Sequence, residues 1–328
     1  MTEWQERPVL VTGAGGFIGS HVVGRLAAAG ARVRALVRYN SRGELGALRW
    51  EPGAAEADIR FADLRDAAAV EAAMAGCEVV IHLGAQIGIP YSYAAPDDVV
   101  QTNVFGTLNV LLAARSLEVE RLVCISTSEV YGSAQRVPID EAHPLNAQSP
   151  YAASKIAADM LAGSFHRSYA CPVGILRLFN GYGPRQSARA VIPTILGQAL
   201  SGDRIRLGSL DTVRDFTYVD DLVEGILAFA AWPGAPGATL QLGAGRGISI
   251  GELVDLAGEI LNRPLEVVAD SQRFRPGASE VDRLICDPSA ARRALGWEPR
   301  VPLREGLEST LEWMETNLAF YRPQAYAV

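Results

Sequence analysis

The chain has 328 residues, of which 49% are hydrophobic and 20% are charged, a composition typical of a folded globular protein of more than one lobe. Its net charge of −7 argues against a nucleic-acid-binding surface, which is normally basic. No segment approaches the roughly 20 apolar residues of a membrane helix, and the polar N-terminal residues do not resemble a signal peptide. The four cysteines and four histidines are scattered, so we expect no disulfide, no metal site and a cytoplasmic location.

The first half of the sequence alternates β-branched runs with helical segments, the order expected for a parallel sheet covered by helices. The run at 79–83 is almost continuously apolar, as in a strand that is buried on both faces. Ser149 and Pro150 are residue types that begin helices, and this helix extends to about Tyr169. The predicted strands are 9–12, 32–37, 59–61, 79–83, 121–126 and 173–178, and the predicted helices are 17–29, 66–75, 97–115 and 150–169.

The second half is less regular and contains more glycine and proline. We expect it to form a smaller mixed α/β domain that packs on the carboxyl edge of the sheet. Ser249 and Glu252 have the spacing of a capping box, which opens a helix ending near residue 262. Two more helices are predicted, one from 287–288 to Gly296 and a last one from Pro302.

A glycine-rich loop joins the first strand to the first helix. The glycines at 13, 16 and 19 have GxxGxxG spacing between a strand and a helix, the context that dinucleotide binding requires. Gly13 permits a tight turn, Gly16 lets the backbone approach a diphosphate, and Gly19 lets the helix pack on the strand. Phe17 and Ile18 begin the helix, whose free N–H groups attract the diphosphate. The sequence therefore predicts a Rossmann-type, doubly wound parallel α/β sheet that binds a dinucleotide.

The end of the second strand bears on the choice between NAD+ and NADP+. Arg38 stands where NAD-binding proteins usually have Asp or Glu, and an arginine there can hold the 2′-phosphate of NADP. An exposed surface arginine explains the residue equally well, so the sequence favours the two cofactors about equally. Further cofactor contacts are expected where the second, third and fourth strands end, at Asn40, Ser41, Asp63, Leu64, Leu83 and Ala85.

Tyr151 and Lys155 are four residues apart near the start of a predicted helix, so their side chains share one face. The chain contains 30 lysines and arginines, and Lys155 is its one lysine, which indicates a position where arginine cannot serve. A tyrosine is a poor base at neutral pH, and a nearby ammonium group is expected to lower its pKa. We therefore predict that Tyr151 is a catalytic base and that Lys155 also contacts the nicotinamide ribose.

The fifth predicted strand ends in a polar segment at the edge of the sheet where ligands bind. Thr127 is placed to hydrogen-bond a substrate hydroxyl beside Tyr151. Glu129 is a carboxylate in a mostly apolar stretch of sequence, which suits an acid/base catalyst, although a surface glutamate is the simpler alternative. Ser128 lies between them and is included in the predicted catalytic segment.

These motifs resemble the extended short-chain dehydrogenase/reductase family, of the NAD-dependent epimerase/dehydratase type, which acts on nucleotide sugars. The resemblance covers nearly the whole chain and is carried by TGAGGFIG at 12–19, STSEVYG at 126–132, SPYAASK at 149–155, LFNGYGPRQ at 178–186, RDFTYVDD at 214–221 and RPG at 275–277.

The resemblance implies a division of the chain and a set of substrate contacts. A dinucleotide-binding domain would comprise residues 1–178 and about 217–243, and a nucleotide-sugar-binding domain about 179–216 and 244–328. Family members commonly form homodimers through the two helices that lie here near 97–115 and 150–169. Arginines are suited to the diphosphate because their planar fork pairs with phosphate oxygens. The substrate-binding residues implied are Gln86, Asn180, Arg185, Val191, Arg214 and Arg275.

The segments 87–93 and 183–194 are most similar to those of configuration-retaining UDP-N-acetylglucosamine 4,6-dehydratases. This similarity implies oxidation at C4, elimination of water across C5–C6 and return of hydride to C6, with NAD(P)+ tightly bound and regenerated in each turnover. Enzymes of the dTDP-glucose type have Asp where this chain has Ser128, so Glu129 would serve as both acid and base.

Three alternatives remain open in the sequence. A 4-epimerase would need only Thr127, Tyr151 and Lys155. A UDP-glucuronate decarboxylase could hold the substrate carboxylate with Arg185. A cofactor-binding protein without catalytic activity is disfavoured, because such a protein would not need the tyrosine and lysine pair.

Overall fold

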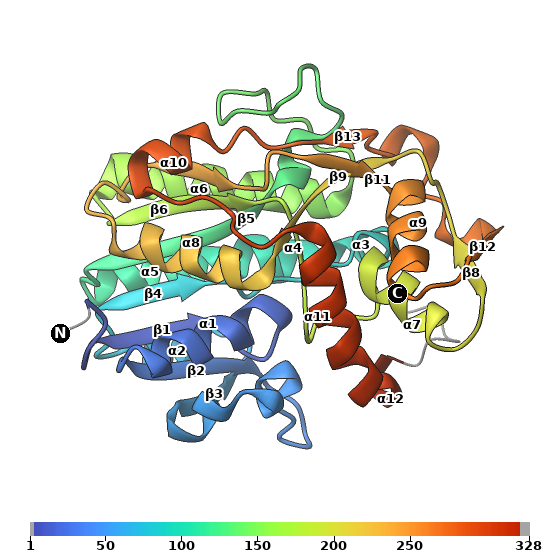
Figure 1. Ribbon diagram of the computed structural model, residues 1–328. Helices are drawn as coiled ribbons and strands as arrows, with labels where there is room; N and C mark the ends of the chain where they lie inside the picture. Colours follow the sequence, from blue (N-terminus) through green and yellow to red (C-terminus); the bar gives the residue numbers. More distant parts are fainter. Residues whose placement is uncertain (1–2, 322–328) are drawn as a thin grey trace.

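A seven-stranded parallel sheet forms the centre of the computed structural model, which describes residues 3–321 (Figure 1). The strand order is β10-β6-β5-β4-β1-β2-β3, and the order of connection reverses between β1 and β4. In such sheets, ligands bind where this reversal opens a crevice at the carboxyl edge. The strands are β1 (Pro8–Thr12), β2 (Arg32–Arg38), β3 (Asp58–Ala62), β4 (Val79–His82), β5 (Arg121–Thr127), β6 (Val173–Leu178) and β10 (Thr239–Leu242). The predicted fold class is therefore confirmed.

Helices cover both faces of this sheet, and the alternation of side chains along β1 shows why. Val9 and Val11 are buried in the cluster that includes α1 (Phe17–Ala28) and α8 (Val219–Ala231). Leu10, between them, points to the opposite face and is buried with α2 (Ala67–Met74), α5 (Gly106–Ser116) and α6 (Pro150–Tyr169). The sheet is thus buried on both sides, as its continuous apolar strands predict.

The predicted helix 97–115 is three consecutive segments. They are α4 (Pro96–Val100), a π turn η3 (Gln101–Phe105) and α5, and a short α3 (Ile89–Ala94) precedes them. A π turn inserts an extra residue into a helix, a feature that the apolar periodicity of the sequence does not reveal. Here it carries the buried Asn103 toward the segment that follows β4.

The second lobe packs beside the carboxyl edge of the sheet. Its strands in the second half of the chain were not predicted, because most of them are short and pair with distant segments. They are β7 (Asn180–Tyr182), β8 (Arg204–Leu207), β9 (Val213–Tyr218), β11 (Gly247–Ser249), β12 (Glu266–Ala269) and β13 (Arg283–Leu284). Its helices are α7 (Val191–Ala199), α9 (Ile250–Ile260), α11 (Leu303–Thr316) and α12 (Leu318–Tyr321), whereas α10 (Ser289–Leu295) packs against α8 and β10 of the first lobe.

Local signals in the sequence set several of these helix boundaries. Ser249 and Glu252 form the predicted capping box at the start of α9. The Ser149 side chain accepts a hydrogen bond from the backbone N–H of Ala152 at the start of α6. Gly296 ends α10 in the left-handed conformation, with φ +63°.

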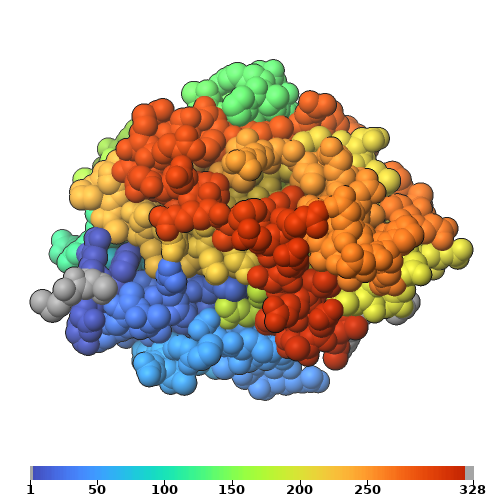
Figure 2. All heavy atoms as spheres, viewed as in Figure 1, coloured from blue at the N-terminus to red at the C-terminus, as the bar shows by residue number. Residues whose placement is uncertain are grey.

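The chain passes back and forth between the two lobes. After β9 in the second lobe, α8 packs against α1 and β10 joins the edge of the large sheet. Figure 2 shows α11, in red, between the blue part of the first lobe and the orange part of the second lobe. Trp313 of α11 there packs against Trp50, with ring centroids 5.3 Å apart. Within residues 3–321, no helix has the length and apolar character to cross a membrane.

Candidate active site

A cavity of about 1110 Å³ lies between the carboxyl edge of the large sheet and the second lobe. The loops after β1 to β6 line it on one side, and residues 186–194, 207–216 and 273–280 line it on the other. Most of the predicted site residues are on its wall: Gly13, Gly16, Phe17, Ile18, Gly19, Arg38, Asn40, Asp63, Leu64, Leu83, Ala85, Gln86, Thr127, Glu129, Tyr151, Lys155, Asn180, Val191, Arg214 and Arg275. Ser41, Ser128 and Arg185 are not on the wall.

The glycine-rich loop has the shape that a dinucleotide diphosphate requires. Gly13 has φ +69°, and a Cβ there would lie 2.8 Å from the backbone nitrogen of Gly84. A Cβ on Gly19 would lie 2.2 Å from the carbonyl oxygen of Gly13, so only glycine lets α1 pack this closely. Gly16 is the N-cap of α1, and the first turn of this helix carries no acidic side chain. Its free N–H groups therefore face the cavity without a competing anion.

The end of the cavity near β2 and β3 differs in detail from the prediction. The Asn40 side chain accepts hydrogen bonds from the backbone N–H groups of Arg42 and Glu44, so it shapes the loop. Hydrogen bonds from Arg65 lower the pKa of Asp63 and occupy both of its carboxylate oxygens. Glu44 lines the cavity on the same side as Arg38.

The predicted catalytic pair lies deep in the cavity wall on α6. Tyr151 and Lys155 are 7% and 6% exposed. Lys155 Nζ donates a hydrogen bond of 2.8 Å to the carbonyl oxygen of Ile125, and burial lowers the pKa of this ammonium. Burial raises the pKa of Tyr151, and a hydrogen bond with Thr127 acts in the opposite direction. The expectation that Lys155 lowers the pKa of Tyr151 is therefore not met in this structure, where the ammonium is bound to a backbone carbonyl.

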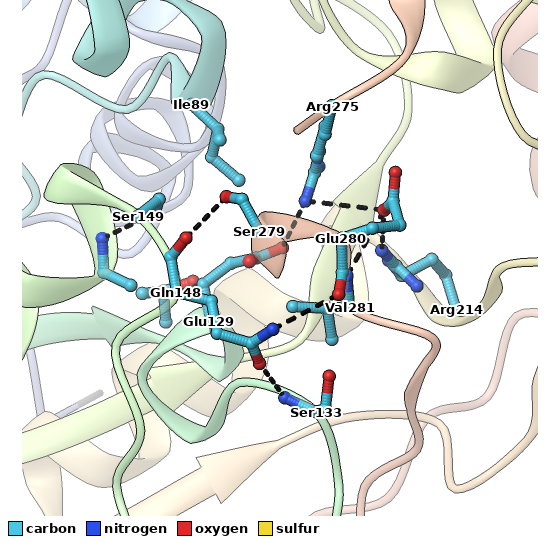
Figure 3. Close-up of polar contacts among 12 residues, drawn as sticks. Ile89, Glu129, Ser133, Gln148, Ser149, Arg214, Arg275, Ser279, Glu280 and Val281 are labelled. Atoms are coloured by element: carbon cyan, nitrogen blue, oxygen red, sulfur yellow. Dashed lines mark hydrogen bonds and ion pairs between the residues drawn. The ribbon is translucent and has the colours of Figure 1, made fainter. Parts of the chain in front are cut away.

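A short helical turn after β5 separates the roles of three consecutive residues. Thr127 accepts a hydrogen bond from the backbone N–H of Glu129 and begins η4 (Ser128–Tyr131). This turn directs Ser128 into the interior, where it is 2% exposed, and brings Glu129 to the cavity. Arg275 Nη1 lies 3.9 Å from Glu129 Oε1 (Figure 3). The surroundings of Glu129 are thus cationic, in contrast to the apolar neighbourhood expected from the sequence.

Arg214 and Arg275 meet at the same part of the wall, together with a glutamate that the sequence analysis missed. Arg214 Nη2 lies 3.6 Å from Glu280 Oε1, and Arg275 Nη1 lies 3.9 Å from that same oxygen. Glu280 follows the Arg-Pro-Gly motif at 275–277 by three residues. Its closeness in sequence to Arg275, a predicted phosphate-binding residue, was the signal that could have identified Glu280.

Arg185 is not a cavity residue, although it was predicted to bind substrate. It has φ +69°, and its guanidinium group lies against α1. Nη1 donates a hydrogen bond of 2.9 Å to Glu51, and Nη2 lies 2.8 Å from Nδ1 of His21. Arg185 therefore links the segment before α7 to the first lobe, while its neighbour Gln186 lines the cavity.

The buried Asn103 holds the segment after β4 against α6. Its amide nitrogen donates hydrogen bonds of 2.9 Å to the carbonyl oxygen of Gln86 and to Ser154 Oγ. Its amide oxygen accepts a 2.7 Å hydrogen bond from the backbone N–H of Gln86. The Gln86 side chain donates to Asp98, so within this structure it is already bonded. Asn103 was not predicted as a site residue. Its polar side chain in the middle of an apolar helical segment was the signal that could have identified it.

Known proteins share both the sequence and this fold. Residues 10–310 match the family model described as GDP-mannose 4,6 dehydratase. The chain is 34% identical to a dTDP-glucose 4,6-dehydratase of Streptomyces antibioticus, over 96% of this chain and 94% of that protein. It is 32% identical to a putative UDP-glucose 4-epimerase of Methanocaldococcus jannaschii, over 94% of this chain and 99% of that protein.

A solved structure extends the comparison to three dimensions. The dTDP-glucose 4,6-dehydratase DesIV of Streptomyces venezuelae, determined with NAD bound, has a TM-score of 0.86 and 32% identity. The match covers 97% of this chain and 99% of DesIV. These similarities span the cofactor loop, the Tyr151 and Lys155 pair and the second lobe together. The chain is therefore an enzyme of the GDP-mannose 4,6-dehydratase family, within the NAD-dependent epimerase/dehydratases that its motifs resemble.

Proposed function

We propose that the protein is a nucleotide-sugar 4,6-dehydratase in which Glu129 is both the acid and the base of the elimination step. One observation carries this proposal: η4 presents Glu129 to the cavity beside Thr127, while Ser128 is directed into the interior. A serine hydroxyl is in any case too weak an acid to protonate a leaving hydroxyl group.

The first step of the proposed reaction is removal of the C4 hydroxyl proton by Tyr151. Thr127 hydrogen-bonds with Tyr151 and would also orient the substrate hydroxyl. Lys155 would hold the nicotinamide ribose from its position one helical turn along α6. When bound, the nicotinamide accepts a hydride from C4 and returns it to C6 at the end of the cycle.

The second step uses the carboxylate of Glu129. The 4-keto group makes the C5 hydrogen acidic, and Glu129 would remove this proton. The same carboxyl group would then deliver the proton to the C6 hydroxyl, which leaves as water. When hydride returns to C6, C5 would be reprotonated. Arg275 Nη1 lies 3.9 Å from the carboxylate of Glu129.

We propose UDP-N-acetylglucosamine as the first substrate to test and dTDP-glucose as the second. Ser128, in place of the Asp found in enzymes of the dTDP-glucose type, supports the former. The names of the Streptomyces relatives support the latter. Both contain a diphosphate, which Arg214 and Arg275 are suited to bind.

Two rival reactions follow from the same site. The Methanocaldococcus relative, a putative 4-epimerase, supports epimerisation with Thr127, Tyr151 and Lys155 alone. Decarboxylation of UDP-glucuronate loses the support of Arg185, whose guanidinium group binds Glu51 and His21. Mass measurement of the products separates the three: loss of water, unchanged mass or loss of carbon dioxide.

Glu129→Gln is the decisive variant. It should oxidise C4, because Tyr151, Lys155 and Thr127 are intact, and then stop before elimination. A positioned acid/base contributes about 10²- to 10⁴-fold, and water release should fall by this factor. Reduced cofactor should accumulate on mixing with substrate, visible by its absorbance, and the C5 hydrogen should not exchange with deuterated water.

Tyr151→Phe is the matched control, because it should block oxidation and give neither reduced cofactor nor product. Release of water by Glu129→Gln at near the wild-type rate would show that another group performs the elimination. Absence of C5 hydrogen exchange by the wild-type enzyme with every nucleotide sugar tested would replace the dehydratase proposal with the epimerase.

We propose NAD+ as the cofactor. DesIV binds NAD, and two carboxylates, Asp63 and Glu44, line the cavity with Arg38 and are paired with Arg65 and Arg42. The site near Arg38 thus holds charges of both signs, whereas a site for NADP is expected to be basic. Titration of the protein with both dinucleotides compares them directly.

We also propose that the protein is a homodimer that associates through η3, α5 and α6. Large apolar side chains are exposed on these elements, with Phe105, Leu112 and Met160 at 47%, 46% and 51% exposure. Exposed apolar side chains that gather on neighbouring helices are typical of protein interfaces. Sedimentation velocity of the full chain measures the association state.

A further inference from the structure

Four charged side chains of alternating sign lie together on the cavity wall. Glu129, Arg275, Glu280 and Arg214 form a connected series of ion pairs, in that order (Figure 3). The proposed mechanism uses Glu129 and the two arginines, but it gives no role to Glu280. Glu280 is 24% exposed at its side chain and lines the cavity.

The position of Glu280 is fixed by the segment that carries it. Gln148, just before α6, donates hydrogen bonds from its amide nitrogen to the carbonyl oxygens of Ala278 and Glu280, at 3.0 and 3.3 Å. Its side-chain oxygen accepts a hydrogen bond from the backbone N–H of Ser133. Ser279 Oγ donates to the carbonyl oxygen of Gln148. The segment is thereby held between the residues that follow Glu129 and the helix that carries Tyr151.

The carboxylate itself is also held. The backbone N–H of Val281 donates a 3.3 Å hydrogen bond to Glu280 Oε1, the oxygen that faces both arginines. Glu280 is therefore a built part of the wall, with its carboxylate close to both arginines.

The two arginines keep hydrogen-bonding capacity for a ligand. Arg214 Nη1 is anchored to the carbonyl oxygens of Val213 and Asp282, at 3.0 and 3.4 Å, which leaves Nη2 directed at Glu280. Arg275 Nη1 is buried and, among residues 3–321, has no hydrogen-bond partner. At 3.9 Å from both glutamates it is attracted by their charge but not bonded.

We propose that Glu280 is an internal counter-ion that neutralises Arg214 and Arg275 until the diphosphate of the substrate takes them over. This inference rests on the proposed function, because it assumes a nucleotide diphosphate in this cavity. Two partly buried guanidinium groups without a counter-ion would repel one another, and Glu280 offsets that repulsion in the free enzyme. Once the diphosphate is bound, Glu280 repels it, which limits affinity and speeds release of the product.

This role predicts that removal of the Glu280 charge strengthens nucleotide binding, whereas most substitutions at a binding site weaken it. Glu280→Gln keeps the shape of the side chain and removes its charge. It should therefore bind UDP and dTDP about five- to tenfold more tightly than the wild-type enzyme, with slower dissociation. The gain should be smaller with UMP, which carries one phosphate. If Glu280 served only to hold the arginines in place, its loss would weaken the binding of all three nucleotides.

Calorimetric titration with UDP, dTDP and UMP measures these affinities. Glu298→Gln is the matched control, because Glu298 pairs with Arg292 on the exposed surface at 3.4 Å and should leave all affinities unchanged. Arg275→Gln should weaken UDP binding, and adding Glu280→Gln to that variant should give less gain than in the wild-type background. Glu280→Ala, with its melting temperature measured in parallel, provides a second neutral variant if the amide disturbs folding.

Unchanged or weaker UDP and dTDP binding by folded Glu280→Gln and Glu280→Ala overturns the counter-ion inference and leaves the dehydratase proposal in place. Tighter binding supports it whatever the product of the reaction is. An enzyme that binds these nucleotides but releases no water from any nucleotide sugar removes the dehydratase proposal and leaves the counter-ion role standing. A wild-type chain that binds neither UDP nor dTDP removes both.

Discussion

Lys155 shows how the surroundings of a side chain restrict what can replace it. Its ammonium group is 6% exposed and donates to the carbonyl oxygen of Ile125, at the base of the cavity where β5 meets α6. Of the 30 lysines and arginines of the chain, the other 29 are arginines. The site accepts a compact charged head on a flexible stem, which the planar guanidinium fork of arginine does not provide.

Lys155→Arg should therefore keep the charge and lose most of the activity. Because a positioned catalytic group is lost, turnover should fall below about a tenth of the wild-type value. The larger group would displace both the contact with Ile125 and the neighbouring Tyr151. Steady-state turnover measures the effect, and the circular dichroism spectrum establishes that the variant is folded. Retention of more than about half of the wild-type turnover would mean that arginine serves here after all.

The residues of the site that sequence could predict are those with a local signature. Thr127, Glu129, Tyr151 and Lys155 follow from their position at the end of a strand or one turn apart on a helix. Glu280 and Arg185 do not, because their roles depend on contacts across the fold. Glu280 meets Arg214 from a segment 66 residues away in the sequence, and Arg185 meets Glu51 over 134 residues.

At the scale of elements, the segment between β2 and β3 is fastened to both lobes. It contains two short helical turns, η1 (Gly46–Trp50) and η2 (Pro52–Glu56). The backbone N–H of Ala47 donates to the carbonyl oxygen of Gly15, in the cofactor loop, at 2.8 Å. Trp50 packs on Phe320 of α12, with ring centroids 4.8 Å apart, and Glu51 binds Arg185. The cofactor loop is thus braced by the second lobe.

Arg185→Met should loosen this brace without removing a substrate contact. Arg185 and Glu51 are 10% and 15% exposed at their side chains, so the change leaves a mostly buried carboxylate unpaired. Breaking a buried pair costs about 3–5 kcal/mol, and partial exposure reduces this to roughly 2–3 kcal/mol. Urea unfolding measures the loss of stability, and UDP affinity should stay within about twofold of wild type.

The double variant Arg185→Met/Glu51→Gln is the control, because it removes the unpaired charge and should recover part of the lost stability. A large loss of UDP affinity with unchanged stability would restore Arg185 to the substrate site.

Helix boundaries such as the start of α6 and α9 were well predicted, because the capping residues lie next to the boundary in the sequence. The strands β9, β11 and β13 were missed because each is specified by its pairing partners and not by its own composition. The π turn before α5 was missed because an apolar pattern of helical period continues through it.

At the scale of the whole molecule, the buried His82 and the half-buried His21 make the fold sensitive to acid. Burial lowers the pKa of His21 to about 4 and that of His82 to about 3. His82 is enclosed by Thr12 and Thr107, with ring nitrogens 2.7 and 3.2 Å from their hydroxyl groups. In the unfolded chain, both histidines have a pKa of about 6.5. As the pH falls below this value, they take up protons in the unfolded chain before they do so in the folded protein.

Above about pH 6.5, both histidines are neutral in the folded and the unfolded chain, and they do not reduce the free energy of unfolding. As the pH decreases toward 4, the free energy of unfolding falls. Each contributes a loss of about 1.4 kcal/mol per pH unit below its unfolded pKa. Asp215 acts in the opposite direction between about pH 6 and 4, because burial raises its pKa to about 6 and the folded protein protonates first. Burial also raises the pKa of Glu141 and Asp220, which act with Asp215. Hydrogen bonds lower the pKa of Asp58, Asp63 and Asp287, which act with the histidines. Because the pKa shifts of the two histidines are the larger ones, the melting temperature should fall between pH 7 and 4.5.

Calorimetric melting in a series of buffers checks this pH dependence. His21→Gln should flatten the decline, since it removes one of the two groups. A melting temperature that stays constant or rises from pH 7 to 4.5 contradicts the inference that His21 and His82 are neutral in the folded protein.

The burial of Lys155 also gives the protein an internal probe of its own opening. Lys155 carries the one side-chain amine that reagents for acylation or reductive methylation can modify. The folded protein encloses that amine at the base of the cavity. The rate of labelling therefore counts how often the active site opens far enough to admit a small reagent. A methyl group enriched in carbon-13, once attached there, would report the electrostatic environment of that amine as a single resonance.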